Sequence, residues 1–242
     1  MCGFTCIIEK TYNCKKDYSN TVYKMLGELS HRGPDEQKIY LDNKNGIYIG
    51  FCRLSMVDIK MSTQPFWDDE HKTAITFNGE IYNYKILRRE FAEETYYTNG
   101  EAELLLKLYK RYGESFVSKL DGMFAICIID LLKGVIFAAR DKQGIKPLYY
   151  YEDSNIFMLA SELKAIRAVI PLEINHRAIE MYFSYRFNLR DQALDQSLVK
   201  LCDGGGLLMD EILQVLDQAH LFILDHAVHL GLLSHKTDCA VD

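Results

Sequence analysis

Apolar and polar positions follow a strand-like period in some segments of the chain and a helix-like period in others. Residues 2–9 form an apolar, β-prone run, so the start of the chain is expected inside a sheet. Residues 18–30 carry apolar side chains at helical spacing, and the pair Gly33-Pro34 cannot continue that helix. A strand, a helix and then several strands in this order predict an α+β fold.

The same periodicities predict the elements in the middle of the chain. Strands are expected at 38–41, 47–54, 73–77, 123–129 and 135–139 and in a hairpin at 148–160, and helices at 83–91 and 102–112. Most connections between strands are short, which indicates antiparallel pairing with helices covering the sheets. The pattern weakens after residue 187, which places a domain boundary within 188–195.

The composition excludes several classes of protein. Of the 242 residues, 48% are hydrophobic and 26% are charged, which is typical of a globular protein. Lys and Arg number 28 and Asp and Glu 34, a net charge of −6, and no basic run is longer than a pair. Nucleic acid and anionic membranes are therefore not expected as partners. The most apolar stretch, 207–233, is interrupted by acidic residues and is not expected to span a membrane.

Cysteine and histidine usage indicates a reduced protein without a metal. Seven cysteines with no Cys-x-x-Cys pair, and no signal-peptide pattern, predict free thiols in a cytoplasmic protein. In the tail, His226 and His229 are spaced so that they can share a helix face and bind zinc. Their spacing matches no established finger pattern, and surface histidines explain it more simply, so no metal is expected.

Cys2 is the first candidate for catalysis. If Met1 is removed, one residue offers both a thiol nucleophile and a free α-amine. An α-amine has an unperturbed pKa of about 7.7–8.0, close enough to neutrality for it to act as a general base. Without further support, a buried strand cysteine is the simpler explanation of this position.

Other polar groups would complete a site for an amino-acid amide. Asn78-Gly79 can present a side-chain amide and a backbone N–H to one point, as an oxyanion hole requires. Arg53 can hold a carboxylate through a bidentate pair, and the acidic pair Glu101 and Glu103 can hold an ammonium. Taken singly, an Asn-Gly turn and solvated surface charges explain these features equally well.

Six motifs follow one another along residues 2–187. They are MCG at 1–3, HRGPD at 31–35, RLS at 53–55, FNGEIYNY at 77–84, ARDKQGIKPLYY at 139–150 and ASELKA at 160–165. In this order they resemble the class II glutamine amidotransferase domain, above all that of glutamine-hydrolysing asparagine synthetases. The resemblance implies an N-terminal-nucleophile hydrolase, a four-layer αββα sandwich with two mainly antiparallel sheets between helices.

The resemblance also implies roles for individual residues. Cys2 would be the nucleophile and its own α-amine the base, while the Asn78 side chain and the Gly79 backbone would form the oxyanion hole. The residues implied to bind the substrate are Arg53, Met56, Val57, Glu80 and Glu101. The implied reaction is thiolate attack on the side-chain amide of L-glutamine, release of ammonia and hydrolysis of a γ-glutamyl thioester, with no cofactor.

Position 101 departs from the family pattern. The family has Ser-Asp where this chain has Gly100-Glu101, and that Asp binds the substrate α-ammonium. Glu101 keeps the charge but is one methylene longer, so an adjusted pocket or weaker glutamine binding is expected.

The resemblance divides the chain into a glutaminase domain at 1–190 and, at 191–242, a linker with the helical start of an incomplete synthetase-like domain. The family's ATP-pyrophosphate loop, Ser-Gly-Gly-x-Asp-Ser, is absent from this sequence. ATP and Mg²⁺ are therefore expected only with a synthetase domain that the sequence lacks, and either a truncated product or a stand-alone glutaminase is expected. The implied partners are L-glutamine and a synthetase domain or subunit that uses the ammonia to make asparagine from aspartate, with a homodimer left open.

Two other functions stay open. If Met1 is retained or Glu101 spoils the pocket, the chain would be a non-catalytic regulatory or interaction subunit that keeps the fold. The same hydrolase chemistry can also serve a different acceptor, such as a sugar or a phosphoribosyl group. The runs FNGEIYNY and IKPLYY favour the asparagine-synthetase branch over those acceptors.

Overall fold

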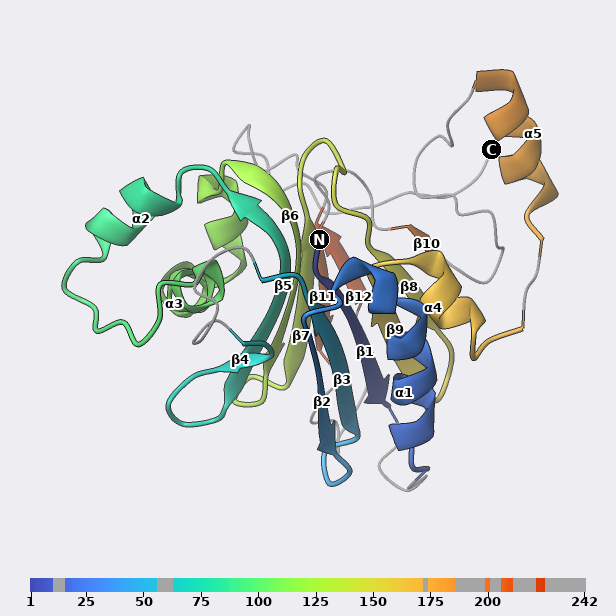
Figure 1. The fold of residues 1–242 in the computed structure, drawn as a ribbon, viewed down its shortest axis with the longest axis horizontal. Helices are drawn as coiled ribbons and strands as arrows, with labels where there is room; N and C mark the ends of the chain where they lie inside the picture. The colour runs from blue at the N-terminus through green and yellow to red at the C-terminus, as the bar shows by residue number, and fades with distance from the viewer. Residues whose placement is uncertain are drawn as a thin grey trace.

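Two six-stranded sheets lie face to face and form the centre of the molecule (Figure 1). The computed structural model describes residues 1–10, 16–55, 63–171 and 174–185, and the backbone of three later strands. Every pair of neighbouring strands in the two sheets is antiparallel. The short connections expected from the sequence therefore produce the antiparallel pairing that was predicted.

The first sheet contains both the start of the chain and the hairpin formed by residues 149–160. In spatial order its strands are β10 (Val199–Lys200), β8 (Tyr149–Glu152), β9 (Ile156–Ala160), β1 (Gly3–Glu9), β3 (Ile47–Arg53) and β2 (Glu36–Asp42). Because β1 lies between β9 and β3, residues from three distant parts of the sequence meet along this strand.

The second sheet is built around the central hairpins of the chain. In spatial order its strands are β12 (Leu221–Leu224), β11 (Gly206–Asp210), β7 (Val135–Arg140), β6 (Gly122–Asp130), β5 (Thr73–Ile81) and β4 (Phe66–Trp67). Strands β5, β6 and β7 are the central part of this sheet, and all three are almost completely buried.

Helices cover the outer faces of both sheets. The helices are α1 (Ser19–Glu28), α2 (Tyr84–Glu90), α3 (Glu101–Tyr112), α4 (Leu163–Arg167) and α5 (His176–Tyr185), with 3-10 turns η1 (Ser30–Arg32) and η2 (Gly113–Lys119). Figure 1 shows α1 and α4 beside the first sheet and α2 and α3 beside the second. This is the four-layer αββα arrangement expected from the sequence.

The hydrophobic core has three layers because side chains on each strand alternate between its two faces. On β1, Cys6 and Ile8 belong to the cluster between the sheets, whereas Ile7 packs with α1 and α4. On β6, Ile126 and Ile128 belong to the outer cluster that contains α3. Burying each such side chain stabilises the fold by roughly 1.5–3 kcal/mol. The alternation therefore holds both the facing sheets and the outer helices in place.

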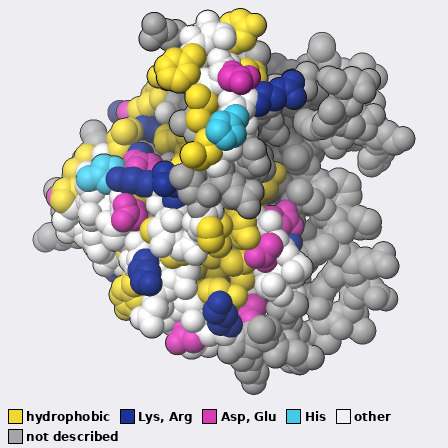
Figure 2. Space-filling view, turned by 90° about the vertical axis from the view of Figure 1, so that its right-hand side faces the viewer, with side chains coloured by type: hydrophobic (Ala, Val, Ile, Leu, Met, Phe, Trp, Pro, Cys, Tyr) yellow, Lys and Arg dark blue, Asp and Glu magenta, His cyan; other side chains and the backbone are white. Residues whose placement is uncertain are grey.

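Helix α5 is the exception to this packing. Among its residues Ala178 is buried, while Tyr182, Phe183 and Tyr185 are exposed. The helix stands apart from the sheets in Figure 1, and Figure 2 shows hydrophobic side chains gathered at the upper part of the face on which it lies. It therefore contributes little to the core around β1.

One predicted strand end is wrong. Strand 73–77 was expected to end before Asn78-Gly79, but β5 continues through both residues to Ile81. Gly79 pairs with Phe124 of β6, and a Cβ at Gly79 would lie 2.2 Å from the Met123 carbonyl oxygen. The glycine therefore allows a close approach of β6 and does not form a turn.

The region beyond residue 190 contains strands. β11 pairs with β7 and β12 pairs with β11, so both extend the second sheet. The helical start expected within 191–242 stays a prediction, because most of these residues lie outside the described part of the chain. The domain boundary itself stays a prediction. Among the described residues no helix is both long and apolar enough to cross a membrane.

Candidate active site

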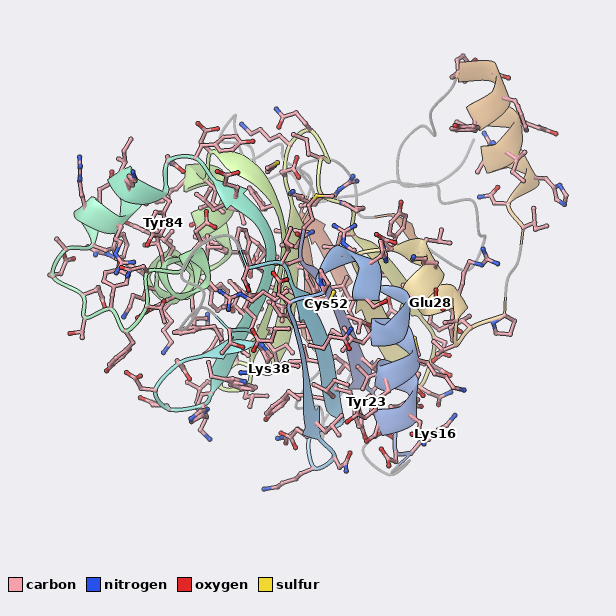
Figure 3. All side chains as sticks on the ribbon, viewed as in Figure 1. Lys16, Tyr23, Glu28, Lys38, Cys52 and Tyr84 are labelled. Atoms are coloured by element: carbon pink, nitrogen blue, oxygen red, sulfur yellow. The ribbon has the colours of Figure 1, made fainter. Side chains whose placement is uncertain are left out.

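Cys2 lies at the entrance to β1, directly before the first residue that pairs with β3. Its side chain is half-buried, and its Sγ lies 3.7 Å from the carbonyl oxygen of Leu54. Gly3 pairs with Cys52, which Figure 3 labels on β3, and the Cys52 thiol donates to the Gly3 carbonyl at 3.4 Å. Burial raises the pKa of Cys52 to about 11, so this buried neighbour of Cys2 stays a protonated thiol near neutral pH.

The Asn78 side chain is brought directly to Cys2. Asn78 lies on β5 and is 2% exposed, and with its amide oriented to satisfy both neighbours, the nitrogen donates to the Cys2 carbonyl oxygen at 3.0 Å. The amide oxygen accepts from Arg32 Nη2 at 3.2 Å. The first two predicted site residues therefore meet, although they belong to different sheets.

Arg32 is a site residue for which the sequence analysis proposed no role. Its Nε donates to the Cys2 carbonyl oxygen at 2.9 Å, so one guanidinium contacts both Cys2 and Asn78. A Cβ at Gly3 would lie 3.0 Å from Arg32 Cδ, so the glycine leaves room for this approach. The run HRGPD at 31–35, noted only as part of the family pattern, was the signal that marked it.

Arg53 is the last residue of β3 and is 5% exposed. Its Nη1 lies 3.4 Å from Glu36 Oε2, and Thr63 donates to the other oxygen of that carboxylate at 3.0 Å. Asp35 fixes the following loop because its side chain accepts from the Ser55 N–H at 2.7 Å. The guanidinium is therefore held at the same strand end as Cys2, while the predicted residues Met56 and Val57 lie outside the described residues.

Glu101, the first residue of α3, supplies a carboxyl group next to β5. Its Oε1 accepts from the Ile81 N–H at 2.6 Å. Burial raises the pKa of Glu101 to about 7, the Ile81 hydrogen bond acts in the opposite direction, and the negative charge of nearby Glu80 raises it further. Glu80 itself is exposed. Glu80 lies two residues from Asn78 along β5, and Glu101 contacts the same strand at Ile81, three residues from Asn78, so the two carboxyl groups form an acidic region at this end of β5.

Glu103 is placed differently from its predicted role. It is 2% exposed, and its carboxylate accepts from the N–H groups of Tyr97 and Thr98, at 2.9 and 2.7 Å, and from the Thr98 hydroxyl at 2.8 Å. These bonds satisfy its charge within the loop that leads into α3. Glu103 therefore shapes the loop before Glu101, which leaves Glu101 as the candidate for an ammonium.

The segment ARDKQGIKPLYY forms a turn fastened by a fully buried Asp141. The Asp141 carboxylate accepts from the N–H groups of Phe124, Ile145 and Lys146 at 3.2, 2.9 and 3.0 Å. These three hydrogen bonds satisfy the buried carboxylate oxygens. Asp141 therefore links the end of β7 to β6 beside Gly79.

Lys146, at the end of this turn, belongs to the same electrostatic environment as Cys2. Burial lowers the pKa of Lys146, and the positive charge of Arg32 lowers it further. The charges of Asp141, Glu80 and Cys2 act in the opposite direction. The motif at 139–150 thus contributes a buried basic side chain near Cys2.

The described part of the chain offers no metal site. It contains no group of three or more His, Cys, Asp or Glu side chains arranged for a metal ion. The tail histidines His226 and His229, considered for zinc, lie outside the described residues. Four of the seven cysteines, Cys2, Cys6, Cys52 and Cys127, are described, and all four are free thiols.

Comparison with known proteins places the chain in a family. The model of the glutamine amidotransferase domain matches residues 1–214. The chain is 38% identical over 231 residues to putative asparagine synthetase [glutamine-hydrolyzing] 2 of Methanocaldococcus jannaschii, covering 87% of this chain and 44% of that protein. It is 36% identical over 208 residues to asparagine synthetase [glutamine-hydrolyzing] 1 of Bacillus subtilis, covering 84% and 33%.

Solved structures support the same fold. Glutamine phosphoribosylpyrophosphate amidotransferase from B. subtilis, complexed with ADP and GMP, superposes with a TM-score of 0.59 at 19% identity, covering 86% of this chain and 47% of that chain. The expected α+β fold, with two mainly antiparallel sheets between helices, is confirmed by this likeness and by the two stacked sheets. The chain spans less than half the length of the two asparagine synthetases. By its match over residues 1–214, this chain belongs to the family of glutamine amidotransferase domains.

Proposed function

We propose that the chain hydrolyses L-glutamine to glutamate and ammonia through a γ-glutamyl thioester on Cys2. The observation that carries the proposal is the 3.0 Å contact between the Asn78 amide nitrogen and the backbone of Cys2. This contact puts a neutral hydrogen-bond donor beside a half-buried thiol, at a strand end that also carries Arg53. Such an arrangement is suited to attack on an amide carbonyl.

Substrate binding uses the two ends of the amino-acid group. The Arg53 guanidinium takes the α-carboxylate in place of part of its contact with Glu36, and the backbone of Met56 and Val57 lies next in the chain. The ionised carboxylate of Glu101, which also accepts a hydrogen bond from the Ile81 N–H, binds the α-ammonium. Glu80 adds negative charge nearby. Holding both charged groups leaves the side-chain amide free to reach Cys2.

The first chemical step needs the α-amine of Cys2, and hence removal of Met1. The amine takes the thiol proton, and the thiolate sulfur forms a bond to the amide carbon of glutamine. The oxyanion that forms accepts hydrogen bonds from the Asn78 side chain and the Gly79 N–H. The buried cations Arg32 and Lys146 favour negative charge at this place.

The second half of the reaction returns the enzyme to its starting state. The C–N bond breaks, and the leaving ammonia takes the proton held by the Cys2 α-ammonium. Water then gives a proton to the same amine and attacks the thioester carbon, so that glutamate leaves and the thiol is restored. No redox change and no cofactor enter this cycle.

The ammonia is proposed to be used for making asparagine from aspartate. The proposal is supported by the printed names of the relatives at 38% and 36% identity. The adenylating step would require ATP and Mg²⁺ bound by a further domain or subunit, because this sequence lacks the Ser-Gly-Gly-x-Asp-Ser loop. The described free thiols are consistent with a reducing compartment such as the cytoplasm.

The direct test is ammonia release from L-glutamine by the untagged full chain after intact mass has shown that Met1 is gone. Cys2→Ala is expected to abolish release, whereas the matched control Cys52→Ala, which removes a buried neighbouring thiol, is expected to keep it. A chain with an uncleavable N-terminal extension is expected to be inactive, because it has no α-amine on Cys2. Equal ammonia release by Cys2→Ala and the unmodified chain would exclude the proposed chemistry.

A further inference from the structure

A series of contacts connects Glu162, near the molecular surface, with Cys2. Glu162 Oε1 lies 2.6 Å from Arg32 Nη1 and 3.0 Å from His31 Nε2. Arg32 in turn donates to the backbone oxygen of Cys2 and to the side-chain oxygen of Asn78, at 2.9 and 3.2 Å. The motif ASELKA, to which no role was given, therefore reaches the active site through one guanidinium.

The backbone directly before Glu162 is fixed relative to Cys2. Ser161 and Phe4 exchange two hydrogen bonds, because the Ser161 N–H donates to the Phe4 carbonyl and the Ser161 hydroxyl accepts from the Phe4 N–H, both at 3.0 Å. Ser161 is fully buried. The residue before Glu162 is therefore tied to β1 two residues after Cys2, so the carboxylate has a defined position.

The charge of Glu162 is matched to the buried guanidinium. The side chain of Arg32 is 6% exposed and that of Glu162 is 22% exposed. Burial opposes ionisation of Glu162, but hydrogen bonds from Arg32 and then His31 outweigh it and hold the pKa of Glu162 below its usual value. A buried arginine without such a carboxylate would keep an uncompensated charge.

We propose that Glu162 is a positioning residue that acts through Arg32 to orient the Asn78 amide and the Cys2 backbone for catalysis. The proposal rests on the proposed glutaminase activity. An asparagine amide can present either its oxygen or its nitrogen to a neighbour, and the choice follows from its hydrogen bonds. Arg32 donates to the Asn78 oxygen, which leaves the nitrogen as the donor that faces Cys2.

Loss of Glu162 would disturb this orientation without touching the substrate. The planar guanidinium uses three nitrogens for three partners, so removal of the Glu162 contact frees one side of it to turn. Arg32 would then donate less well to Asn78, and the amide would spend part of its time with its oxygen toward the developing oxyanion. In this orientation the amide oxygen repels the oxyanion. The transition state is then less stabilised, and kcat falls.

The test compares the full chain with Glu162→Ala, Glu162→Gln and the matched control Lys164→Ala. Lys164 is an exposed neighbour that lies 3.6 Å from Glu162 Oε2, so its removal changes the surface charge without touching Arg32. For Glu162→Ala we expect kcat to fall about ten- to a hundredfold with KM changed by less than about threefold. Glu162→Gln keeps an oxygen for Arg32 and is expected to recover kcat to within about fivefold, whereas Lys164→Ala is expected to stay near the unmodified value.

A double-mutant cycle separates positioning from general stability. If Glu162 acts through Arg32, Glu162→Ala has less than about a twofold further effect on kcat in an Arg32→Ala background. Should Arg32→Ala fail to fold, as judged by thermal melting, Asn78→Ala serves as the background. Additive losses, or an unchanged kcat in Glu162→Ala, would overturn the proposal. An unmodified chain that releases no ammonia would instead count against the glutaminase function itself.

Discussion

The ionisation of Glu101 is expected to control glutamine affinity within the physiological pH range. Burial raises the pKa of Glu101 to about 7, and only the ionised carboxylate attracts the substrate α-ammonium. With that pKa, the ionised fraction rises from about one-tenth at pH 6 to about nine-tenths at pH 8. If glutamine binds only the ionised form, KM for glutamine should fall about tenfold between these two pH values.

The raised pKa of Glu101 also affects stability. As pH rises, ionisation of Glu101 strengthens glutamine binding but destabilises the folded chain, and the two effects can be measured separately. The pKa of Glu101 is 4.5 as an unperturbed group and about 7 in the folded chain. Between these values the folded chain keeps a proton that the unfolded chain has lost, so the free energy of unfolding decreases as pH rises from 4.5 to about 7. At about 1.36 kcal/mol per pKa unit the full loss has an upper limit of about 3 kcal/mol.

Glu101→Gln tests both effects, because glutamine keeps the shape and an oxygen for the Ile81 N–H but cannot ionise. Steady-state ammonia release from pH 6 to pH 8 is expected to show a KM in Glu101→Gln that is high and nearly independent of pH. Thermal melting is expected to show equal stability of the two chains near pH 4.5 and a more stable variant at pH 8. A KM that falls equally in both chains, or parallel stability profiles, would refute this reasoning.

Further substitutions test the geometry of the site. Asn78→Ala removes one oxyanion donor and is expected to lower kcat about a hundred- to a thousandfold with little change in KM, measured by ammonia release. Arg53→Ala should instead raise KM for glutamine by more than about tenfold with a smaller effect on kcat, because its loss removes substrate binding. Gly79→Ala places a Cβ 2.2 Å from the Met123 carbonyl oxygen and is expected to lower the melting temperature in calorimetry. Asp141→Ala leaves backbone N–H groups unpaired and should destabilise the chain by about 3 kcal/mol or more in urea unfolding. Unchanged melting in the last two variants would contradict the packing described for β5 and β6.

The secondary structure follows closely from local patterns. The expected helices at 83–91 and 102–112 correspond to α2 (Tyr84–Glu90) and α3 (Glu101–Tyr112), because each has one apolar face that packs on a sheet. The end of β5 could not be predicted in this way. Asn-Gly is a turn signal by local rules, and only the approach of β6 explains why the strand continues.

The site required long-range pairing as well as motifs. Cys2 directly precedes β1 of the first sheet and Asn78 lies on β5 of the second, so their spacing in the sequence carries no information about their contact. The resemblance to a family supplied their roles, but it did not indicate that Arg32 joins them or that Glu162 holds Arg32. For Glu103 the sequence suggested a binding role that the structure does not support. Its carboxylate accepts hydrogen bonds from the loop before α3 and is not free to bind an ammonium.

The most direct test of the account is detection of the thioester itself. The processed chain would be mixed with L-glutamine, quenched in acid within the first turnovers and analysed by intact and peptide mass spectrometry. The account predicts a chain heavier by one γ-glutamyl group, with the added mass on the N-terminal peptide that contains Cys2 and absent from Cys2→Ala. Ammonia release without any such adduct, or an adduct on Cys52 instead, would contradict the assignment of Cys2 as the nucleophile.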